Sequence, residues 1–314
     1  QASAQERENI PVEAPQNAIS AQESEALLKA ANELLTEVSS DEKAEKEYNK
    51  AQLEEQRQAV SAADQESIAM LQRGELPASA DNLMAAHALT HGRENIFALS
   101  DRRRAEGEKR TEPENPEQEP VESTSLWEKL DDRENFAESY ERMTGDALES
   151  VEEATFEEAE SSVDVRHMQL NHKQLTVAAS LAQREEYYLP MYVGETLTRV
   201  HLTLDRNSPQ KGTVTIGVTL SEEAHMQARL YLENDTVHGI LFGEGKVEVM
   251  KLQQIADTFR KEAEGSWTVG NISTIASEKR MPELIRSGAH TPTESAELYR
   301  VARVFLHSVV QQGE

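Results

Sequence analysis

The sequence predicts an α+β protein: a helical, partly disordered N-terminal half is followed by a C-terminal antiparallel β-meander packed against helices. Charge divides the chain, because residues 1–170 hold 40 acidic and 17 basic side chains, whereas residues 171–314 hold 18 and 15. Apolar residues in the first half recur mainly at helical spacing. From residue 200 onward, apolar and polar residues alternate, which is the period of a half-buried sheet.

The N-terminal half predicts three regions. The first, 1–20, is polar and contains two prolines, so we expect it to be disordered. The second, 21–104, predicts several helices, one of which is capped by Ser79. The Arg102–Arg103–Arg104 run near its end is interpreted as a cation cluster at a helix C-terminus rather than a nucleic-acid patch. The third, 105–124, is an acidic, Pro-rich linker.

The segment 125–163 predicts an acidic helical region, whose part after residue 149 is expected to pack poorly because it is so acidic. The α+β domain is expected over 164–314 and begins with a helix over 164–186. The pattern of apolar residues then changes from helical to strand spacing at residues 187–194, which read Tyr-Tyr-Leu-Pro-Met-Tyr-Val-Gly.

The sheet core is expected over about 187–275. Three strands have alternate apolar residues: Val200, Leu202, Leu204; Val214, Ile216, Val218, Leu220; and Met226, Ala228, Leu230, Leu232. A fourth strand is expected over 236–242 and a fifth over 267–275, with an amphipathic helix between them. Short, turn-rich connections such as Asn234-Asp235 favour antiparallel pairing. A last helix is predicted to begin at an N-cap, Thr291, with Glu294 completing a capping box.

Composition excludes several classes of function. A strongly acidic half repels phosphate backbones, so we expect no nucleic-acid partner. The sequence has no apolar run of the roughly 20 residues that a membrane span needs, so we expect no membrane insertion. It has no cysteine, which excludes disulfides and thiol catalysis. Residues 1–20 lack a signal-peptide pattern, and a cytoplasmic location is expected.

No pattern in the sequence predicts an active site, so we expect no enzyme, no cofactor, and no catalytic or metal-binding residue. Adjacent carboxylates such as Glu185 and Glu186 point to opposite faces of a strand and are interpreted as surface glutamates. Three histidines on neighbouring strands (His201, His225 and His238) leave a metal-dependent hydrolase open as the least favoured alternative.

Six threonines predict a neutral, exposed sheet face: Thr196, Thr198, Thr203, Thr213, Thr215 and Thr219. Such a surface could accept a further strand at its edge, but ordinary β-propensity is the favoured explanation.

One short segment is similar to a known family. Pro190-Met191-Tyr192-Val193-Gly194, followed by alternating strands and an amphipathic helix, resembles the C-terminal domain of bacterial flagellar hook-length control proteins. That family has Pro-x-x-Leu-Gly at this place, and Val193 replaces its Leu. The resemblance covers about 164–314 and extends to uncharacterised hook-length-control-like proteins of clostridial bacteria.

The resemblance implies a non-enzymatic regulator that is exported through the flagellar type III apparatus. Its C-terminal domain would bind the export-gate switch protein and change the class of exported substrate. Leu189, Pro190, Val193 and Gly194 would contact that partner or shape the contact. The family places a helix after its second strand, where this chain has the strand-like 226–232. The alternative function is an acidic helical adaptor or scaffold that binds a basic partner.

Overall fold

The computed structural model describes residues 65–92, 94–108, 123–157, 162–208, 211–221, 223–277 and 296–312. The expected disordered start, the helices before residue 65 and the Thr291 cap lie outside these residues. Contacts divide the chain into two compact units, Gln1–Ser61 and Ala62–Glu314. All the described helices therefore belong to the same unit as the sheet, and this unit begins about 100 residues before the boundary expected at 164.

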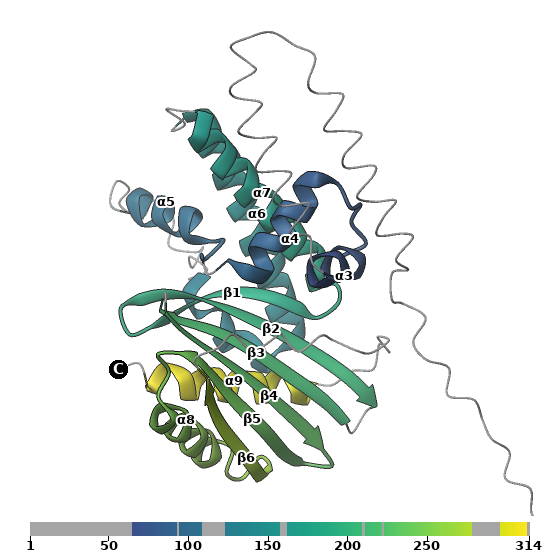
Figure 1. The fold of residues 1–314 in the computed structure, drawn as a ribbon, viewed down its shortest axis with the longest axis vertical. Helices are drawn as coiled ribbons and strands as arrows, with labels where there is room; N and C mark the ends of the chain where they lie inside the picture. Colours follow the sequence, from purple (N-terminus) through teal and green to yellow (C-terminus); the bar gives the residue numbers. More distant parts are fainter. Residues whose placement is uncertain are drawn as a thin grey trace, which may run out of the picture. The chain divides into compact units, whose positions relative to one another are not determined.

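The α+β class is confirmed, with six strands that follow one another in chain order across one sheet (Figure 1). The strands are β1 (Glu186–Val193), β2 (Thr196–Ser208), β3 (Lys211–Ser221), β4 (Ala224–Glu233), β5 (Thr236–Gly245) and β6 (Thr268–Ser277). The first five form the expected antiparallel meander. The last strand instead runs parallel to β5, because helix α8 (Val249–Glu262) carries the chain back before β6 begins.

Two hairpins depend on residues with positive φ. In the β1–β2 hairpin, Gly194 has φ 60°, and it stands first in the two-residue turn between the paired residues Val193 and Thr196. In the β4–β5 hairpin, Asn234 and Asp235 have φ 48° and 62°. Positive φ at both central residues is the type I′ geometry that fits the twist of the flanking strands. The expected turn at these two residues is therefore confirmed.

One face of the sheet forms the core. The alternating residues predicted for it are buried, as Val200, Ile216 and Ala228 illustrate. Helix α8 and helix α9 (Ala296–Gln311) cover this face, and their Phe259 and Phe305 rings meet edge to face. The cover is close: a Cβ atom at Gly212 would lie 2.6 Å from Leu298 of α9.

The helices that precede the sheet are α3 (Gln65–Arg73), α4 (Ala80–His91), α5 (Ala98–Glu108), the 3-10 helix η2 (Ser123–Asp131), α6 (Arg133–Glu157) and α7 (Ser162–Ala182). The Ser79 cap is confirmed, because its hydroxyl accepts a hydrogen bond from the Asn82 amide (3.3 Å). Helix α5 continues to Glu108, so the first four residues of the expected linker are helical.

One local prediction about these helices was wrong, and another holds in part. The run from Arg102 to Arg104 lies in the middle of α5 rather than at its C-terminus, and Arg103 pairs with Glu153 of α6. The acidic end of α6 packs only in part, because Val151 and Ala154 are buried whereas Phe156 is 88% exposed. The small apolar residues of this acidic segment reach the core, but its one aromatic side chain does not.

Strand β1 was expected only as a boundary, and α7 was expected to continue through its first residue. The helix in fact ends at Ala182, and a turn leads directly into the strand. Six of the eight residues of β1 are buried, on both faces. A strand with apolar residues on both faces shows no alternation of apolar and polar residues, so the period of β1 is not visible in the sequence.

The expected threonine face is also wrong. Thr196 pairs with Val193 and Thr198 with Met191, which places both on the apolar face of the sheet. Thr213 and Thr219 lie on the opposite face but are buried. The six threonines therefore form no common exposed surface.

Candidate functional site

The four residues expected to bind a partner lie along the β1–β2 hairpin in different environments. Leu189 is fully buried on the apolar face, opposite Val200. Pro190 is buried on the other face and suits an edge strand, where a missing N–H costs no ladder bond. Val193 is partly buried, and Gly194 is exposed in the turn. Only the end of the hairpin presents this segment to solvent.

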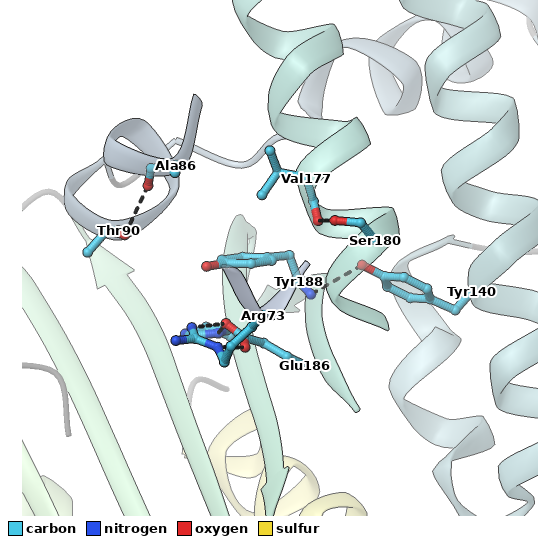
Figure 2. Close-up of polar contacts among 9 residues, drawn as sticks. Arg73, Ala86, Thr90, Tyr140, Val177, Ser180, Glu186 and Tyr188 are labelled. Carbon is cyan, nitrogen blue, oxygen red and sulfur yellow. Dashed lines mark hydrogen bonds and ion pairs between the residues drawn. The ribbon is translucent and has the colours of Figure 1, made fainter. Parts of the chain in front are cut away.

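A partly buried ion pair joins β1 to α3. Arg73 donates two hydrogen bonds to the Glu186 carboxylate, from Nε (2.8 Å) and Nη2 (3.0 Å), as Figure 2 shows. The ring of His201, on β2, lies 3.2 Å from the same carboxylate. Because an ionised carboxylate only accepts, His201 Nε2 carries the donated proton. The cluster therefore fixes α3 against the first two strands.

The electrostatics of this cluster favour the ionised carboxylate. Burial alone would raise the pKa of Glu186, whose side chain is 1% exposed. The His201 hydrogen bond and the Arg73 charge and hydrogen bonds together outweigh burial and lower the pKa to about 2. Such a carboxyl carries no proton at neutral pH, so it cannot serve as a general acid.

Tyr188 extends the cluster along the strand. Its ring stacks on His201 with centroids 4.4 Å apart and planes 4° apart, and the Arg199 guanidinium lies 5.7 Å from its centroid. Arg199 also donates to the Gly92 carbonyl just after α4. These contacts attach the α3–α4 region to the same part of the sheet as the Glu186 pair.

A second polar cluster lies on the apolar face at the start of β1. Glu185 has φ 56°, and its Oε1 accepts from Arg206 (2.6 Å) and from the Tyr299 hydroxyl (3.2 Å). The Tyr187 hydroxyl lies 2.9 Å from that of Tyr299 and donates to it, since the Tyr299 proton is directed to Glu185. This cluster connects β1 and β2 to α9.

Burial dominates the titration of these tyrosines. It raises the pKa of Tyr187 well above its usual range. Burial and then the charge of Glu185 raise the pKa of Tyr299 to about 12. Neither phenol ionises near neutral pH, so both act as hydrogen-bonding groups that position α9.

Both glutamates differ from the prediction of surface carboxylates. They point to opposite sides, as expected, but both are buried, because each meets an arginine from a distant element. No sequence signal identified these partners: Arg73 is 113 residues from Glu186. Pairing with arginine is what makes burial of a carboxylate tolerable.

Two of the three strand histidines are neighbours. His201, which contacts Glu186, and His225 both flank Gly217, whereas the His238 ring lies against Gly270. On α7, the exposed His167 and the partly exposed His172 lie near Glu94 and Glu152. Within the part of the chain that the structure describes, no three His, Cys, Asp or Glu side chains are placed to hold a metal ion.

Comparison with models of protein families, with curated proteins and with solved structures finds no match to this chain. Among the described helices, none has both the length and the apolar character that crossing a bilayer requires.

Proposed function

We propose that this protein is a non-enzymatic regulator of type III export, similar to hook-length control proteins. In this proposal its C-terminal domain binds the export-gate switch protein. Two features of the sequence support the proposal: the acidic first half precedes a nearly neutral α+β domain, and the Pro190–Gly194 segment resembles the family motif.

The environment of the β1–β2 hairpin is the observation that carries the proposal. Leu189 and Pro190 are buried and hold the strand in place, whereas Tyr192 is 43% exposed and Gly194 is exposed in the turn. A rigid strand that ends in an exposed aromatic residue suits protein recognition, in which tyrosine is enriched. In this proposal Tyr192 and Val193 contact the export-gate switch protein. Leu189 and Pro190 hold the strand that presents them.

The test is a pulldown of the full chain with the cytoplasmic domain of the export-gate switch protein. Tyr192→Ala is expected to weaken binding about tenfold or more, the range of a modest interface anchor. Tyr231→Ala is the matched control, because Tyr231 is similarly exposed but lies on β4. The proposal fails if the wild-type chain does not bind, or if deleting the protein leaves hook length unchanged.

A second candidate is an acidic adaptor that binds a basic partner through its first half, and the charge asymmetry of the chain favours it. Binding of this kind weakens steeply as salt is raised, because exposed charges are screened. A salt titration of partner binding distinguishes the two: hairpin-mediated binding depends on Tyr192, and acid-mediated binding depends on ionic strength.

A further inference from the structure

The two edges of the sheet are protected to different degrees. On β1, six of eight residues are buried, and the outward N–H of Tyr188 donates to the Tyr140 hydroxyl of α6 (3.3 Å; Figure 2). On β6, Ile272 alone of ten residues is buried, and within the described residues no strand pairs with its outer edge. A helix contacts the outer edge of β1, whereas β6 is a ten-residue strand whose residues are mostly partly exposed or exposed.

The sequence of β6 lacks the usual protection of an edge strand. Natural edges carry charges, prolines or short strands that discourage pairing with another chain. None of the ten residues of β6 is charged or a proline, and half of them are β-branched. Their sequence is Thr-Val-Gly-Asn-Ile-Ser-Thr-Ile-Ala-Ser. Ile275 is 46% exposed on this strand. These are the properties of a strand that accepts another strand.

The second half of β6 is regular enough to pair. An irregularity between Val237 and Gly239 interrupts the register near the start of β6, and Arg260 donates to the Ile272 carbonyl there (3.4 Å). From Ile272 to Ser277 the strand pairs with β5 without interruption. The available edge is therefore centred on Thr274 and Ile275.

We propose that this edge pairs with β6 of a second copy of the chain, antiparallel and about a two-fold axis. A symmetric contact places a strand against itself, so the strand must be self-compatible. An uncharged strand meets this condition, because no like charges face each other across the axis. It also lies in the half of the chain that is nearly neutral, in a protein of net charge −26.

The segment of the same chain that follows β6 is a poorer occupant. Residues 278–295 contain two prolines, Pro282 and Pro292, and six charged side chains. Proline removes a ladder donor, and charges oppose burial beside Ile275. A second β6 supplies a complete row of donors and acceptors instead.

The dimer is expected to be weak and reversible. Pairing two segments of this length forms about six backbone hydrogen bonds, at the low end for a protein interface. The acidic first halves repel one another, and salt screens this repulsion. Association is therefore expected to strengthen as salt is raised, in contrast to acid-mediated binding of a basic partner.

Sedimentation equilibrium of the full chain, from about 1 to about 200 µM at low and high salt, tests this contact. The wild type is expected to dimerise within that range. Ile275→Lys places two like charges at the axis and is expected to weaken association about tenfold or more. Ile275→Thr, which keeps a β-branched uncharged side chain, is expected to retain it.

Met250→Lys adds the same charge at an exposed site on α8 and is the matched control, with circular dichroism verifying the fold of each variant. A wild type that stays monomeric at about 200 µM overturns the proposal, as does an effect of Ile275→Lys that Met250→Lys reproduces. Slow exchange in a monomer at those amides of 273–276 that point away from β5 would also overturn it, since the chain itself would then cover this edge.

Discussion

Arg73 and Glu186, which are 113 residues apart in the sequence, form a bidentate ion pair with N–O distances of 2.8 and 3.0 Å. The pair joins α3, the first described helix, to β1, the edge strand of the sheet. Two parallel N–H···O bonds fix the angle between the partners as well as their distance. The helical part of the unit is thereby held in one orientation on the sheet.

The Glu186 pair predicts acid sensitivity. The pKa of the Glu186 carboxyl is about 2 in the folded protein and 4.5 in the free group, so the carboxylate stabilises the fold above about pH 4.5. That contribution, roughly 3 kcal/mol, is expected to be lost as pH falls from about 4.5 toward 2. Urea unfolding at a series of pH values measures the loss.

Glu186→Gln is expected to remove most of this pH dependence and to destabilise the protein by about 1–3 kcal/mol at neutral pH. Glu75→Gln is the control, because Glu75 is a well-exposed carboxylate paired with Arg184. An acid transition that is unchanged in Glu186→Gln would assign the acid sensitivity to other groups.

The hydrogen bond between α6 and the outer edge of β1 predicts that removing the Tyr140 hydroxyl destabilises the protein. Tyr140→Phe keeps the buried ring but removes the acceptor for the Tyr188 amide. The expected cost is about 1–2 kcal/mol in the free energy of unfolding, since a buried N–H loses this partner. Hydrogen exchange should accelerate at Tyr188 more than at β3 amides. A uniform acceleration would indicate general loosening instead.

The two hairpins predict changes of opposite sign. Gly194→Ala places a side chain at φ 60° and is expected to cost about 1 kcal/mol. Asp235→Gly relieves the same backbone conformation in a type I′ turn and is expected to stabilise by about 0.5 kcal/mol. Thermal unfolding of both variants measures the two effects. Stabilisation by Gly194→Ala would contradict the assigned turn geometry.

Within the segment that resembles the family motif, we expect substitutions at one end of β1 to reduce stability and substitutions at the other end to reduce partner binding. Leu189→Ala opens a cavity in the core and is expected to cost about 2–5 kcal/mol. Val193→Ala, at the partly buried end of the strand, is expected to cost less than about 1 kcal/mol. Urea unfolding together with the export-gate pulldown tests this: Val193→Ala should affect binding more than stability.

Strands in which apolar and polar residues alternate were predictable. The alternation at Val200, Leu202 and Leu204 and its repetition in the next two strands correctly predicted β2, β3 and β4. The amphipathic helix expected after the fourth strand is present as α8: its Leu252, Ile255 and Phe259 are buried, whereas Val249 at its start is 42% exposed. Periodicity reports which side of an element is apolar, and in these elements that side faces the core.

The clusters around the hairpin were not predictable. Glu185 and Glu186 were expected at the surface because they lie in a polar stretch and point to opposite faces of a strand. Their partners Arg206 and Arg73 come from β2 and α3, and Tyr299 comes from α9. Burial of a charge depends on the position of its counter-charge, which only the folded chain supplies.

The sequence by itself determined the α+β class, the strands from β2 to β5, and the helices that cover them. These follow from local periodicity and turn residues. The tertiary structure decided that β1 is a doubly buried edge strand, that β6 runs parallel, and that the helices from α3 onward join the sheet in one compact unit. Those features arise from contacts between residues far apart in the chain, which local patterns do not record.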